Sequence, residues 1–254
     1  MVRVLALLVA LFLVAPLLVV IPMSFSTSIS LQFPPPGYGL GYYRAYFQSQ
    51  AWLEATLNSF VVAAASTVMT MLLVVPAAFG YVRYRFRGKM LFNLLMMAPL
   101  IVPHVVTALA YYGYFSLMRL NGTIPGLALA HSVLAIPIAF LVVCATLKGF
   151  DRNLERAAMS CGAGPLRTFA WVTLPLLFPG MMVGAFLAFL ASFNEAVVSI
   201  FVAGRRAETL PKKMYDSIRL EADPTIAVVS TLLIGAVLAG ALVSAMLRRK
   251  PVRA

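Results

Sequence analysis

Glu195 is the one acid that lies well inside a long apolar stretch of this sequence, residues 177–203. An ionised side chain in such a place costs at least ~2.5–3.5 kcal/mol on insertion scales, so it usually faces a cavity or a partner. We interpret Glu195 as part of a translocation pathway, where it binds an amine or takes part in opening and closing a gate. The alternative is an acid that snorkels, or is paired at an interface, near the outer rim of its helix.

Three further polar residues are candidates for the same pathway, and each has a structural alternative. His104 follows Pro99 and Pro103, which free backbone carbonyls and kink a helix; we favour a core histidine with one hydrogen bond over a pathway role. Asn58 opens another apolar stretch, and we favour a hydrogen bond between helices over a pathway role. Tyr111 either lines an outer vestibule or belongs to an interfacial aromatic belt, and we favour the belt.

Motifs that mark an enzyme are absent from the sequence. It has no G-x-x-x-x-G-K-[ST] for a P-loop, no H-E-x-x-H and no G-x-S-x-G. The two histidines lie 27 residues apart, and the two cysteines, Cys144 and Cys161, have neither metal-binding nor disulfide spacing. We therefore expect no catalysis, no metal ion and no ATP hydrolysis in this chain.

The composition requires a lipid bilayer as the solvent for most of the chain. Of the 254 residues, 62% are hydrophobic and 11% are charged, against about 25% charged residues in a typical soluble domain. The net charge of +12 comes from Lys and Arg that stand between apolar stretches. Nucleic-acid binding is therefore disfavoured, and the basic residues indicate membrane topology instead.

Six apolar stretches are each long enough to cross a hydrocarbon core about 30 Å thick. They are residues 4–25, 57–82, 91–115, 127–147, 177–203 and 225–247 of a single domain, 1–254. With both termini in the cytoplasm, 13 of the 20 Lys and Arg residues fall on the inner side, as the positive-inside rule favours. We expect the first stretch to be a retained helix rather than a signal peptide, because its apolar run is longer than a signal core. The sequence thus predicts an all-α membrane protein with about six transmembrane helices.

The inner loop at residues 148–176 has an order that is unusual between two spans. Asp151 or Asn153 can cap a first short helix. Gly162 suits the left-handed residue that ends it, and Pro165 suits the first turn of a second short helix. Two short helices separated by a bend are therefore expected.

The spacing within this loop resembles that of the permeases of ABC importers with the type I fold. Their pattern is Glu-Ala-Ala, three residues, Gly, nine residues, an aliphatic residue, one residue and Leu-Pro. The matching residues here are Ala157, Ala158, Gly162, Val172, Leu174 and Pro175. The acid of the pattern falls at position 156, where this chain has Arg156 directly after Glu155. In the family this acid lies on a segment that contacts a partner ATPase. Here either Glu155 supplies the negative charge of that contact, or the charges of the contact are reversed in sign.

The resemblance implies that the first short helix is a coupling helix, which docks into a cleft of a partner ATPase. The coupling residues it implies are Glu155, Arg156, Ala157, Ala158 and Gly162. It also implies a second, different permease subunit, two ATPases that bind ATP and Mg, and an extracytoplasmic solute-binding protein. All of these would work at the bacterial inner membrane, and the chain itself would hold no cofactor.

A wider likeness covers roughly residues 30–245 and looks like the polyamine (spermidine/putrescine) branch, in particular its second permease subunit. The segments that carry it are Thr56-Leu57-Asn58-Ser59, Tyr84-Arg85-Phe86-Arg87-Gly88-Lys89 and Ser192-Phe193-Asn194-Glu195. That branch often has Asp where this chain has Asn194, and an acid where it has His104. Both positions belong to the expected substrate pathway.

The resemblance implies a permease subunit that moves a small polar solute inward by alternating access, a polyamine or related amine foremost. The same machinery for a phosphonate, an opine or another small organic solute is the alternative. A stand-alone secondary transporter is disfavoured, because that class predicts internal repeats, which the sequence does not show.

Overall fold

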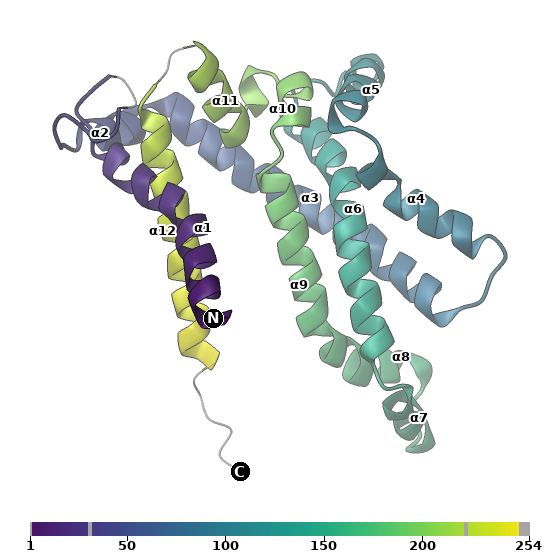
Figure 1. Ribbon diagram of the computed structural model, residues 1–254. Coiled ribbons are helices and arrows are strands. Elements are labelled where there is room, and N and C mark those ends of the chain that lie inside the picture. The colour runs from purple at the N-terminus through teal and green to yellow at the C-terminus, as the bar shows by residue number, and fades with distance from the viewer. Residues whose placement is uncertain (1, 30–31, 221–222, 249–254) are drawn as a thin grey trace. The chain divides into compact units, whose positions relative to one another are not determined.

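The computed structural model describes residues 2–29, 32–220 and 223–248, and the regular structure within them is helical (Figure 1). The chain divides into two units, one of residues 1–54 and 213–254 and one of residues 55–212. Residues 249–254 lie outside the described residues. They hold most of the C-terminal basic cluster, on which the predicted cytoplasmic position of the C-terminus partly rests.

The first unit brings the two ends of the chain together. α1 (Val2–Ser24) packs along α12 (Thr225–Arg248), and α2 (Gly41–Gln48) also packs on α12. Most of α11 (Leu210–Leu220) belongs to the same unit, where Lys213 Nζ lies 5.7 Å from the centroid of the Trp52 ring. The loop predicted between the first two spans therefore contains a short helix, α2.

The second unit contains the remaining helices. α3 (Gln50–Arg83) enters it at residue 55. The helices that follow are α4 (Lys89–Ile101), α5 (His104–Leu117), α6 (Ile124–Gly149), α7 (Arg152–Ser160), α8 (Pro165–Thr168), the π turn η1 (Phe169–Thr173), α9 (Leu174–Phe193), α10 (Val197–Val202) and the 3-10 turn η2 (Arg205–Ala207).

α6 is the centre of the second unit. Its start is fixed by Thr123, whose hydroxyl accepts a hydrogen bond from the backbone N–H of Gly126 at 3.1 Å. Its buried face forms an apolar core with α3 and α9, in which Phe140, Val74 and Leu177 are each almost completely buried. α6 and α9 lie side by side over most of their length (Figure 1).

Glycine allows α9 to approach α6 closely. A Cβ on Gly180 would overlap the side chain of Thr146, and a Cβ on Gly184 would lie 3.3 Å from Val143. Small residues at such crossings let helix backbones pack tightly, which is a common basis of helix association in membranes.

The helices test the predicted spans by length and composition. Among the described residues, four helices are long and apolar enough to cross a membrane: Val4–Ser24, Gln50–Arg83, Ile124–Gly149 and Pro165–Phe193. The pair α4 and α5 would add a fifth, and Thr225–Gly240 is a shorter apolar helix. The chain is thus an all-helical, multi-pass membrane protein, and the count of six spans stays a prediction.

Two of the expected spans differ in detail from the helices. In the third, the kink predicted from the prolines is a full break, because Val102 and Pro103 are extended and α4 and α5 meet at 99°. The fifth span was predicted over 177–203, but the continuous helix runs from Pro165 to Phe193. It begins early because η1 joins α8 directly to α9, and it ends early because α10 is a separate helix.

The close approach at Gly180 makes a stability prediction. Gly180→Ala would push the added methyl into Thr146, and overpacking of this kind costs typically 1–3 kcal/mol. We expect a lower midpoint of thermal unfolding for the detergent-purified protein. Gly113→Ala on α5 is the matched control, since nothing lies within 4 Å of a Cβ there. Equal midpoints for the two variants would contradict the packing described for α9 on α6.

Candidate functional site

Glu195 lies at the break between α9 and α10, with both carboxylate oxygens engaged. Oε1 accepts a hydrogen bond from the backbone N–H of Val198 at 3.0 Å, and Oε2 lies 3.2 Å from Nδ1 of His104 at the start of α5. The carboxylate is 9% exposed, while the His104 side chain is 49% exposed. A buried carboxylate needs such charge-assisted partners, and one of its two partners here is accessible to other molecules.

His131 anchors the same break from α6. Its Nδ1 lies 2.9 Å from Ser192 Oγ on α9, and its Nε2 lies 3.2 Å from Ser199 Oγ on α10. The Ser199 hydroxyl also donates to the Glu195 backbone carbonyl at 2.9 Å. One buried imidazole thereby ties both sides of the break to α6.

The other pathway candidates do not join this cluster. Asn58 donates through Nδ2 to the backbone carbonyls of Arg206 and Glu208, at 3.2 and 3.0 Å. Tyr111 stacks on Phe115 with ring centroids 5.4 Å apart. Asn194 is exposed next to Glu195 and ends α9. Among the candidates, the structure therefore brings together Glu195 and His104, with Asn194 adjacent in the chain.

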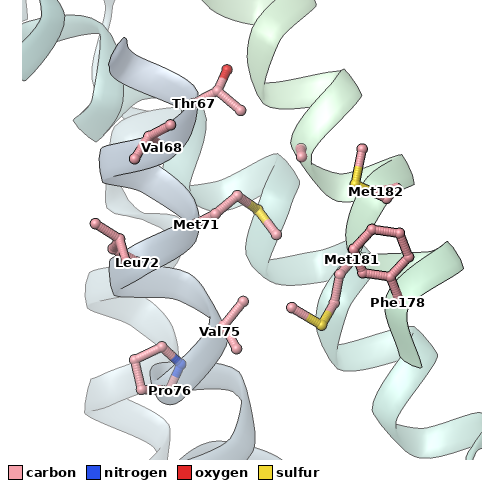
Figure 2. Close-up of a pocket in the computed structure, with 10 residues that line it drawn as sticks. Thr67, Val68, Met71, Leu72, Val75, Pro76, Phe178, Met181 and Met182 are labelled. Atoms are coloured by element: carbon pink, nitrogen blue, oxygen red, sulfur yellow. The ribbon is translucent and has the colours of Figure 1, made fainter. Parts of the chain in front are cut away.

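A separate hollow between α3 and α9 does not suit a polar solute. The space has a volume of about 480 Å³. In Figure 2, Met71 and Val75 of α3 face Phe178 and Met181 of α9. Its lining is apolar, and the one hydroxyl, on Thr67, is already donated to a backbone carbonyl at 2.7 Å. A polar solute would lose its hydration there without replacement hydrogen bonds.

At the opposite end of α6 and α9, α7 is a short, well-capped helix, as the sequence predicts (Figure 1). The Asp151 carboxylate accepts from the Asn153 N–H at 2.9 Å and so caps its start. Gly162 ends it with φ of +86°, and its N–H donates to the Met159 carbonyl at 3.0 Å. Pro165 starts α8, again as predicted.

Glu155 of α7 is turned toward the rest of its own unit. Its Oε1 lies 2.8 Å from Nη2 of Arg83, the last residue of α3, and accepts from Thr173 Oγ1 in η1 at 2.7 Å. We call these three residues the α7 clamp. The Arg83 guanidinium also lies over the ring of Phe150, 5.3 Å from its centroid. The clamp fixes α7 to both α3 and the start of α9.

The other coupling candidates differ from Glu155 in exposure. Arg156 and Ala157 are exposed, Ala158 is half-buried, and Gly162 is exposed at the turn. The surface that α7 offers to another molecule therefore includes Arg156 but not the carboxylate oxygen that the clamp holds.

The family of the chain follows from comparison with known proteins. The model of the family described as "Binding-protein-dependent transport system inner membrane component" matches residues 73–250, more than half of the chain. The chain belongs to this family. It is therefore a membrane-embedded permease subunit of an ABC importer rather than an enzyme, as its loop pattern predicted.

Two curated Escherichia coli K12 proteins are similar to the permease over most of its length. The putrescine transport system permease protein PotI is 33% identical over 233 residues, which cover 89% of this chain and 83% of PotI. The spermidine/putrescine transport system permease protein PotC is 28% identical over 226 residues, 88% of this chain and 84% of PotC.

A solved structure supports the fold independently. It is a bacterial ABC transporter involved in the import of the acidic polysaccharide alginate, and one of its chains matches with a TM-score of 0.70. The match covers 98% of this permease and 94% of that chain at 14% identity. The predicted ABC importer permease fold is confirmed.

Sequence reasoning did not foresee several residues of these two sites. Arg83 and Glu155 lie 72 positions apart, and nothing in either segment indicates their pairing. Thr173 is an ordinary residue of a predicted connecting loop. Ser192 lies one turn before a buried acid, and a serine at that spacing is a detectable signal of a polar network.

The His131 network predicts a difference between the two histidines. His131→Ala leaves two buried serine hydroxyls with one partner fewer, at a cost of about 1–3 kcal/mol for each unsatisfied group. We expect it to lower the midpoint of thermal unfolding much more than His104→Ala, whose half-exposed ring is replaced by water. Similar losses in both variants, measured in the same detergent, would contradict the anchoring role of His131.

Proposed function

We propose that this permease moves a polyamine or a related small amine inward across the bacterial inner membrane. Glu195 is the observation that carries the proposal, since a buried carboxylate at a helix break attracts a cation and repels a phosphonate. The likeness to permeases named for putrescine and for spermidine/putrescine transport supports the same solute class.

The geometry around Glu195 suits exchange of the His104 ring for an ammonium group. The Val198 N–H binds one carboxylate oxygen, and Ser199 of the His131 network binds the Glu195 backbone carbonyl. The half-exposed His104 ring covers the other carboxylate oxygen. An ammonium group that displaces this ring would form the charge-assisted hydrogen bond in its place. Asn194 beside it would add an amide oxygen to the same surface.

The rest of the machine follows from the family. The permease would pair with a second, different permease subunit, receive solute from an extracytoplasmic binding protein, and dock two ATPases. ATP and Mg would bind only the ATPases, because this chain has no P-loop motif. Closure of the ATPases would move α7, and the clamp would pass this motion to α3 and α9 as alternating access.

Transport by a reconstituted complex tests the solute and the role of Glu195 together. We expect ATP-dependent uptake of radiolabelled putrescine or spermidine into liposomes that contain the permease pair, its ATPases and the binding protein. Glu195→Gln keeps an acceptor for the Val198 N–H but removes the charge, so uptake should fall by about tenfold or more, as loss of one charge-assisted hydrogen bond implies.

Glu54→Gln is the matched control, since Glu54 is an exposed acid that accepts a hydrogen bond from Gln50, one turn earlier in the chain. Uptake that proceeds without ATP would refute the importer, and uptake of a phosphonate in preference to polyamines would refute the solute class. A Glu195→Gln complex that transports at the wild-type rate would remove Glu195 from the pathway.

The left-handed turn at Gly162 gives a test of coupling. Gly162→Val places a β-branched residue at φ of +86°, which is strained by about 1–2 kcal/mol, and should misplace the end of α7. We expect normal membrane insertion but lost ATPase assembly or ATP-driven uptake. Gly164→Val has the same open surroundings and an ordinary φ of −69°, so it should behave nearly as wild type; equal loss in both would argue against coupling through this turn.

A further inference from the structure

A hollow of about 420 Å³ lies between the end of α3 and α7. Its charged lining consists of Arg83, Arg152, Arg156 and Glu155, and Phe79 and Met159 supply apolar walls. Three cations and one anion thus face a single open space outside the apolar stretches of the chain.

The one anion in this hollow is already neutralised. Arg83 and Thr173 bind the same oxygen of Glu155, and the nearby Asp151 caps the start of α7. Among the described residues, neither Arg152 nor Arg156 takes part in an ion pair, and both are exposed. The hollow therefore carries two uncompensated positive charges.

Apolar side chains accompany these charges on the surface of α7. Met159 is 47% exposed and Leu154 is similarly exposed. Trp171 of η1 is 82% exposed and lines a second hollow of about 580 Å³, to which α7 contributes Ala158. Arg, Met and Trp are enriched in protein interfaces, where a buried centre is surrounded by a polar rim. A lipid headgroup would neutralise the arginines, but it would leave these apolar side chains in water.

We propose that the hollow receives an acidic side chain of the ATPase, so that Arg156 and Arg152 supply the cations of the docking contact. The inference rests on the proposed function, in which α7 docks on an ATPase, and it names the chemistry of that contact. The charge pair is thereby reversed relative to the family pattern, which has an acid at position 156. Glu155 acts as a positioning residue that holds α7 through the clamp, and it does not itself meet the partner.

The test measures binding of the ATPase, identified by its P-loop and ATP hydrolysis, to the complete permease pair in nanodiscs. Arg156→Glu should weaken the affinity by at least about tenfold, as like-charge juxtaposition at an interface does, and Arg156→Ala should weaken it less. Replacement of one Asp or Glu in the docking cleft of the ATPase by Lys should restore binding to Arg156→Glu. Arg205→Glu, the same charge change at an exposed position at the other end of α6, should bind as wild type.

Three results would overturn the inference, and they differ from one another. If the wild-type permease binds no ATPase, the proposed function fails and the inference with it. If wild type and Arg156→Glu bind the ATPase equally well, the function stands and the reversed contact is wrong. If Arg156→Glu instead loses binding only to phosphatidylglycerol vesicles, the hollow takes an anionic lipid headgroup and not the ATPase.

Discussion

The close packing of α6 against α9 is the contact on which both sites depend. Gly180 and Gly184 remove side chains where the two helices meet, so their backbones approach closely. At one end of this pair, His131 holds Ser192 and Ser199 around the break that carries Glu195. At the other end, the chain leaves α6 for α7 and returns through η1 to α9. The 20 residues of α9 separate the two ends by about 30 Å of helix, and a packed helix pair can transmit a displacement over that distance.

The α7 clamp extends this pair to a third helix. Arg83 ends α3, Glu155 belongs to α7, and Thr173 lies just before α9, so one carboxylate oxygen joins three segments that are remote in sequence. A hydrogen-bonded ion pair with partly buried partners holds geometry better than an exposed pair, because it is less screened by solvent. The two ends of the α6–α9 pair therefore differ. At one end, the Glu155 carboxylate is bound within the chain and holds α7. At the other end, the His104 partner of Glu195 is accessible and can be replaced by another group.

Sequence reasoning predicted the features that depend on local conformation. A cap at Asp151 or Asn153, a left-handed stop at Gly162 and a helix start at Pro165 were foreseen, because each follows from the stereochemistry of a single residue, and the structure places the cap at Asp151. The apolar stretches and the family pattern likewise predicted the fold. The pairing of Arg83 with Glu155 and of His104 with Glu195 could not be derived, because it depends on how helices far apart in sequence pack. The early start of the fifth helix was missed because a π turn has no sequence signature here.

That π turn adds a residue before α9 with almost no change in helical phase. A π turn holds one residue more than an α-helical turn would, and it places Thr173 against Glu155. Each residue of an α-helix advances the chain by about 100° around its axis. Because the π turn closes one revolution with that extra residue, loss of a single residue between 169 and 173 with relaxation to α-helix would leave the direction of α8 and α7 around the axis of α9 nearly unchanged. Loss of a second residue, which no π turn absorbs, would rotate them by about 100°. The segment therefore holds one residue whose loss would cost the contact of Thr173 with Glu155 but not the direction of α7.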